Sequence, residues 1–164
     1  MHSYGVETVI DLRAPGERAS WPSPVQGWRG YRARPVFEDA ALEFLEERFS
    51  DDQAGFYVWA LESRAQGIAA ILKAIADAPP GGVVIHCGIG KDRTGIVAAL
   101  LLALIEVGRE AILSDFMLSG ERLSPLPLLG GLDPGFGSAV ARPPDFEEVV
   151  TAIAYGLPSG APSR

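Results

Sequence analysis

The chain contains one cysteine, two histidines and no long apolar run in its 164 residues. Cys87 has no second cysteine to pair with, so an internal disulfide is excluded and nothing indicates an oxidising compartment. The longest apolar run, Ile96 to Val107, is too short to span a bilayer. Residues 1–11 lack a basic stretch followed by an apolar one, so we expect no signal peptide. These absences predict a cytoplasmic protein without membrane insertion.

Basic residues are also scarce. The formal net charge is -7, which disfavours nucleic acid or an anionic membrane surface as a partner, because either would need a basic face. A site for an anion would have to be built locally, from backbone amides and a few well-placed cations. Since Lys73 and Lys91 are the only lysines, those cations would mostly be arginines.

The hydrophobic pattern predicts one α/β domain with a mainly parallel central sheet flanked by helices. With 48% hydrophobic residues, the chain is long enough to bury its own core, and we expect this domain to cover residues 1–156. Strands are expected at 7–12, 30–37 and 83–86, the last of them fully buried. Helices are expected at 39–49, 56–78, 94–107 and 110–118, with a last one at 145–154. We further expect a turn at 13–16, Gly108 as the C′ residue after the helix at 94–107, an irregular segment at 119–144 and a flexible tail at 157–164.

The segment around the cysteine has the order strand, glycine-containing loop, helix. The first amides of a helix lack internal partners and the helix dipole is positive there, so such a loop binds anions. Gly88 and Gly90 allow successive N–H groups to converge on one centre. The loop lacks the Gly-Lys-Ser/Thr ending of a Walker loop and the third glycine of a dinucleotide fingerprint.

Five residues separate Cys87 from Arg93 in this loop. A cysteine beside a helix N-terminus should have a lowered pKa, within roughly 3.5–7.5, and so act as a nucleophile. Arg93 can grip two phosphate oxygens with its planar fork. Thr94 is placed to hydrogen-bond the cysteine sulfur when it leaves, and His86 to orient and polarise the thiolate from behind. Read alone, Cys87 would instead be an inert buried thiol.

Three stretches resemble one family. Residues 86–95, HCGIGKDRTG, look like the HCxxGKDRTG phosphate loop of bacterial atypical tyrosine phosphatases, within the cysteine-dependent, dual-specificity-like superfamily. Residues 5–13, GVETVIDLR, resemble the family's G-I-x-x-V-x-D-L-R strand, in which we expect Asp11 and Arg13 to be structural. Residues 114–119, SDFMLS, resemble its helix after the loop. The family usually begins earlier, so we expect this chain to lack the usual N-terminal segment.

The resemblance implies a metal-independent and cofactor-independent phosphatase in which Cys87 forms a cysteinyl-phosphate. Its substrate would be a phosphorylated protein, a phosphoinositide or a small phosphate ester, while the oligomeric state stays open. Lys91 would reach a second anionic group, and Asp92 would hold the loop or exchange protons within it. The phosphate-binding residues would be Gly88, Ile89, Gly90, Lys91, Asp92 and Arg93.

The resemblance also implies a general acid in the loop after the second strand, where Asp39 fits best. Asp51, Asp52 and Asp92 are the alternatives. Two other functions stay open: a phosphate-recognition module without turnover, and an arsenate reductase, which would need an external thiol because the chain has no second cysteine.

Overall fold

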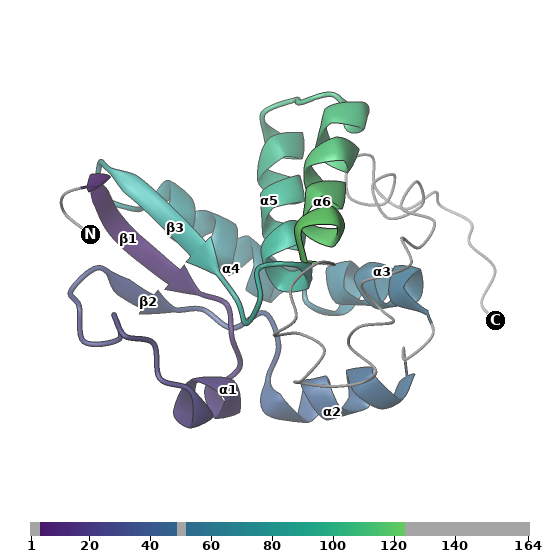
Figure 1. Ribbon diagram of the computed structural model, residues 1–164, viewed down its shortest axis with the longest axis horizontal. Coiled ribbons are helices and arrows are strands. Elements are labelled where there is room, and N and C mark those ends of the chain that lie inside the picture. The colour runs from purple at the N-terminus through teal and green to yellow at the C-terminus, as the bar shows by residue number, and fades with distance from the viewer. Residues whose placement is uncertain (1–3, 49–51, 124–164) are drawn as a thin grey trace.

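The computed structural model describes residues 4–48 and 52–123. Their centre is a parallel sheet in the order β2-β1-β3, formed by β1 (Val6–Asp11), β2 (Tyr31–Ala33) and β3 (Gly82–His86) (Figure 1). β-branched residues dominate β1 and β3, as is typical of strands packed in a sheet. Helices flank the sheet, so the predicted α/β class with a parallel sheet is confirmed.

The described helices agree only in part with the expected boundaries. The turn expected at 13–16 runs into a short helix that the pattern did not predict. The helix expected at 56–78 is two helices, because Arg64 leaves the helical conformation at φ -117° and ψ 15°. The irregular segment expected from residue 119 begins inside a helix. The helices are α1 (Pro15–Ser20), α2 (Asp39–Arg48), α3 (Gln53–Ser63), α4 (Ala65–Ala76), α5 (Asp92–Leu104) and α6 (Arg109–Leu123).

Helix α5 ends earlier than the sequence predicted, and Gly108 is not its C′ residue. The Glu106 amide donates to the Ala103 carbonyl, and the Val107 amide donates to the Leu102 carbonyl, both at 3.0 Å. Together with φ of 60° at Glu106, these bonds form a Schellman motif with Glu106 in the left-handed position. Leu104 and Ile105, expected in a buried helix, are 67% and 72% exposed because they lie beyond the packed part of α5.

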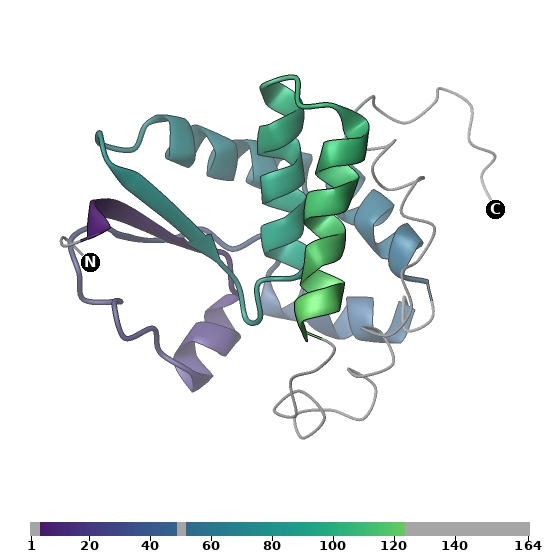
Figure 2. The same cartoon turned by 45° about the horizontal axis from the view of Figure 1, so that its top comes forward.

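The core lies between one face of the sheet and the helices α2 to α6 (Figure 2). Val83 and Ile85 of β3 point into it, whereas Val84 points to the other face and is 38% exposed. The expectation of a fully buried third strand is therefore wrong, since the described helices cover only one face of β3. The largest fully buried side chains are Tyr57, Phe37, Ile10, Leu12, Ile71, Ile96 and Ile112.

Parallel strands bring their following loops to one edge of the sheet. Asp11 is in register with Ala33 of β2 and with His86 of β3, so all three strands end together. The ladder continues one step further, where the Leu12 amide donates to the His86 carbonyl at 2.8 Å. The loop with Cys87 thus starts beside the residues that follow β1, at the edge where α/β sheets hold their ligands.

Three expectations concern residues that the structure does not describe. The irregular segment beyond residue 123, the helix at 145–154 and the tail at 157–164 lie outside the described residues. Within the described ranges, no helix is long and apolar enough to cross a membrane.

The contact between α5 and α6 predicts a difference between two glycines. A Cβ on Gly95 would lie 2.5 Å from the Phe116 ring, whereas a Cβ on Gly67 in α4 would meet nothing within 4 Å. We expect Gly95→Ala to lower the free energy of unfolding by about 1–3 kcal/mol through overpacking. Gly67→Ala should raise it by about 0.5–1 kcal/mol, because alanine favours the helix. Urea unfolding measures both, and a Gly95→Ala protein as stable as the parent would contradict the packing described.

Candidate active site

Cys87 directly follows β3 and begins the loop that leads into the first turn of α5. Its side chain is buried, and the Gly90 amide donates to Sγ at 3.3 Å. Gly90 has φ of 81°, which a side chain would strain, and this conformation turns its N–H toward the sulfur. The loop therefore presents a backbone donor and a helix N-terminus to the Cys87 sulfur, as an anion site requires.

Arg93 is held by Glu17 of α1. Nη2 of Arg93 donates to Oε1 of Glu17 at 2.8 Å, and Nη1 donates to Oε2, which makes the pair bidentate. Oε2 also accepts a hydrogen bond from the Ala14 amide at 2.8 Å, so Glu17 is itself fixed at the start of α1. Gly88 lies next to this pair, since a Cβ there would be 3.7 Å from Nη2. The pair fixes the Arg93 guanidinium beside the loop.

The charges of this pair stabilise each other. Burial disfavours the ionised form of Glu17, but the hydrogen bonds from Arg93 and Ala14 outweigh it and lower the pKa of Glu17 below its ordinary 4.5. Burial also opposes the charge of Arg93, yet the pKa of Arg93 is raised by Glu17 and by nearby Cys87. Both groups are therefore charged near neutral pH.

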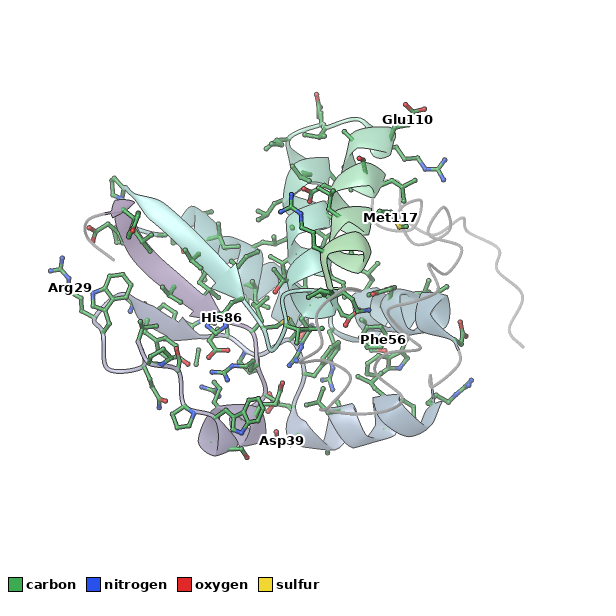
Figure 3. All side chains as sticks on the ribbon, viewed as in Figure 1. Arg29, Asp39, Phe56, His86, Glu110 and Met117 are labelled. Carbon is green, nitrogen blue, oxygen red and sulfur yellow. The ribbon has the colours of Figure 1, made fainter. Side chains whose placement is uncertain are left out.

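Asp11 joins the ends of β1 and β2 and lies near the end of β3. Its carboxylate is fully buried and accepts hydrogen bonds from the Arg13 side chain and amide and from the Tyr31 hydroxyl. Burial works against ionisation here too, but these donors lower the pKa of Asp11. His86 Nε2 lies 3.6 Å from the same carboxylate, and Nδ1 lies 3.1 Å from the Cys87 carbonyl oxygen. His86 is thus anchored behind Cys87, at the end of β3 (Figure 3).

Lys91 and Asp92 are engaged with the protein. Lys91 is buried, and its Nζ donates to Oδ1 of Asp92 at 2.6 Å. The hydroxyl of Tyr57, from α3, donates to the same oxygen. Burial, reinforced by Asp92, raises the pKa of Tyr57, which keeps the phenol protonated as a donor. These contacts tie the end of the loop to α3.

The remaining predicted residues divide between the loop and its surroundings. Thr94 Oγ1 is buried and forms no hydrogen bond with any described residue, and its expected bond to the departing sulfur stays a prediction. Asp39, at the start of α2, accepts from the Gly16 amide at 2.8 Å, one residue from Glu17 (Figure 3). Asp52 instead caps α3 through the Gly55 amide at 2.8 Å. Asp51 lies outside the described residues.

Comparison with known proteins identifies the family. A family model described as the tyrosine phosphatase family matches residues 1–129. The chain belongs to the tyrosine phosphatase family.

Within residues 4–48 and 52–123, no group of three or more histidine, cysteine, aspartate or glutamate side chains is placed to hold a metal ion.

Individual members of this family match different shares of the chain. The tyrosine-protein phosphatase of Nostoc commune is 31% identical over 148 residues, which is 87% of this chain and 50% of that protein. Protein tyrosine phosphatase domain-containing protein 1 of Danio rerio is 30% identical over 102 residues, 62% of this chain and 13% of that protein. The triple specificity protein phosphatase PtpB of Mycobacterium tuberculosis is 41% identical over 44 residues, 27% and 16% of the two chains. The chain thus spans half of the Nostoc phosphatase and less of the others.

Two site residues of this tyrosine phosphatase family member escaped the sequence reasoning. A proline at the start of a helix and an acidic residue in its first turn are typical of a helix N-terminus, and Pro15 with Glu17 fits that pattern. This pattern is the signal that could have marked Glu17. Tyr57 lies within an apolar helix that looks like ordinary core, and nothing in its local pattern sets it apart.

The Glu17–Arg93 pair predicts a pH-dependent coupling. Because the pKa of Glu17 is lowered on folding, its contribution to stability is complete above its ordinary 4.5 and is lost as the pH falls through the lower folded value. A double-mutant cycle with Glu17→Gln and Arg93→Gln should give a coupling of about 1.5–3 kcal/mol near pH 7. The coupling should shrink steadily below about pH 4.5. Urea unfolding at several pH values measures it, and a coupling that stays constant into acid would contradict the charged pair.

Proposed function

We propose that this chain is a phosphomonoester hydrolase of the HCxxGKDRTG subgroup that acts through a cysteinyl-phosphate on Cys87. The observation that carries this proposal is the bidentate Arg93–Glu17 pair beside Cys87, because it holds a guanidinium in place for a phosphate above the sulfur. The Gly90 amide at Sγ adds support, since it suits an anionic sulfur. The protein would supply every group that the reaction needs.

In the first step, the Cys87 sulfur attacks phosphorus and the bond from phosphorus to the ester oxygen breaks. Arg93 has five N–H donors, and Glu17 takes one from Nη1 and one from Nη2. The Nε hydrogen and the second hydrogen of Nη2 remain for two phosphate oxygens in a second fork. Loop amides at the start of α5 would bind the others. Such fixed donors stabilise the charge of the transition state.

The departing oxygen needs a proton, and we assign its donation to Asp39. This carboxyl lies at the catalytic edge, hydrogen-bonded to Gly16 next to Glu17. Asp92 is less suited, because Lys91 and Tyr57 both engage its Oδ1. In the second step, water attacks phosphorus and gives its proton to Asp39. The sulfur–phosphorus bond then breaks, which releases inorganic phosphate and regenerates the thiolate.

We propose phosphotyrosine or a related phosphoprotein or phosphoinositide as substrate. The support is the family itself and the printed names of its members, which include a tyrosine-protein phosphatase and a triple specificity protein phosphatase. We expect His86 to orient Cys87, and Thr94 to approach the sulfur once phosphate binds. We place the activity in the cytoplasm, in line with the single cysteine.

Hydrolysis of p-nitrophenyl phosphate tests the proposal. Cys87→Ser should abolish turnover, because an alcohol replaces the thiolate nucleophile. Rapid mixing of the parent protein should give a burst of nitrophenolate before the steady state if hydrolysis of the intermediate is slower than its formation. A parent protein no more active than Cys87→Ser would reduce the site to phosphate recognition.

The identity of the acid follows from leaving-group dependence. Asp39→Ala should lower kcat/KM for an alkyl phosphate by about 10²–10⁴-fold, since alkoxide departure needs protonation. The same variant should lose far less on p-nitrophenyl phosphate, whose leaving group departs readily as an anion. Asp92→Asn is the matched comparison, expected to affect both substrates alike. The reverse pattern would assign the acid to Asp92.

A further inference from the structure

A cavity of about 250 Å³ lies beside the catalytic loop, between α5 and α6. Gly90, Thr94 and Gly95 are shared with the loop but Cys87 and Arg93 are not, so the cavity lies next to the phosphate position assigned to Cys87 and Arg93. From α6 it receives one cation and one anion, Arg122 and Asp115, with Ser119 between them. The complete lining is Gly90, Thr94, Gly95, Ala98, Asp115, Phe116, Leu118, Ser119 and Arg122.

The two charges lie at different ends of the cavity. Helices α5 and α6 are joined by a short connection and run side by side in opposite directions (Figures 1 and 2). Close approach of Gly95 to Phe116 fixes their register. Arg122 is seven positions after Asp115, a rise of about 10 Å along a helix. Arg122 therefore lies toward the loop end, near Gly90, and Asp115 lies toward Ala98.

Arg122 is a further cation near the loop, and it is not engaged as Lys91 and Arg93 are. Lys91 is buried against Asp92, and Arg93 is held by Glu17. The side chain of Arg122 is exposed, and no acidic side chain in the described ranges is paired with it. In a chain of net charge -7, an unpaired arginine at the rim of an anion site marks a local positive position.

We propose that this cavity is a subsite for a second oxyanion of the substrate, bound by Arg122 with Ser119 as a further donor. The inference rests on the proposed phosphatase function and narrows its substrates to compact phosphomonoesters that carry a second oxyanion near the first. The planar guanidinium accepts a carboxylate or a phosphoryl group in the same bidentate way. Arg122, and not Lys91, then determines the preference for doubly anionic substrates.

Matched aryl phosphates test the subsite. The substrates are the ortho, meta and para isomers of carboxyphenyl phosphate with their neutral carboxamides, and resorcinol bisphosphate with its monophosphate. Arg122→Gln should lower kcat/KM by about tenfold for at least one carboxylate isomer or for the bisphosphate, as loss of a charge-assisted pair requires. It should change the values for the neutral partners less than about twofold, within the scatter expected for a surface substitution. The carboxylate arm and the bisphosphate arm show which oxyanion the subsite takes.

Arg109→Gln is the control, because it removes the same charge at the opposite end of α6. It should leave every ratio of dianionic to neutral substrate unchanged. If Arg122→Gln and Arg109→Gln lower all substrates equally, long-range charge explains the effect and the subsite is wrong. If Arg122→Gln changes no ratio, the subsite is also wrong.

A binding measurement separates this inference from the proposed function. Calorimetry on Cys87→Ser, with and without Arg122→Gln, measures affinity for resorcinol bisphosphate without turnover. A weaker affinity in the double variant supports the subsite, whether or not the parent protein hydrolyses phosphate esters. If the parent protein hydrolyses none of them, that result overturns the phosphatase proposal and leaves the subsite standing. Equal affinities, beside normal hydrolysis by the parent, would overturn the subsite alone.

Discussion

The hydrogen bonds to the buried carboxylate of Asp11 are the interactions on which the loop edge of the sheet depends. A charge without solvent is tolerated only where donors surround it, and here they come from Arg13 and Tyr31, while His86 Nε2 lies 3.6 Å away. The two donors belong to the end of β1 and to β2, and His86 belongs to the end of β3. Removing Arg13 or Tyr31 would leave the carboxylate under-satisfied, so the requirement to satisfy one ion holds the end of β1 against β2. The loop that begins at Cys87 inherits its position from that arrangement.

Further ion pairs and a hydrogen bond hold the loop on two sides. Glu17 holds Arg93 from α1, while Tyr57 and Lys91 hold Asp92 from α3 and from the loop itself. Each contact joins a charged group to a partner on another element or at the loop's own end, so the loop is held on two sides. Donors that are fixed before a substrate arrives need no reorganisation during reaction, and such preorganisation is how phosphoryl transfer is accelerated.

How much was predictable depended on distance along the chain. The segment from His86 to Gly95 is contiguous, so its strand, loop and helix could be predicted from local pattern, and the parallel sheet followed from alternating strands and helices. Glu17 and Tyr57 are 76 and 35 residues from their partners, and no local pattern encodes a contact across such a separation. The break at Arg64 lies among good helix formers with no proline nearby, so periodicity alone extended one helix across it. The end of α5 was misplaced because glutamate, and not the neighbouring glycine, adopts the left-handed conformation there.

The 76-residue separation between Glu17 and Arg93 also orders events during synthesis. The chain emerges from its N-terminus, so the glutamate is already made when the arginine appears. The pair can close only after the crossover through α2, α3 and α4 brings β3 alongside β1, and β3 must be in register for the loop to reach α1. A nascent or partly folded chain therefore exposes its cysteine without an oriented arginine. The order of assembly therefore delays the pairing of Arg93 with Glu17 until the sheet is complete.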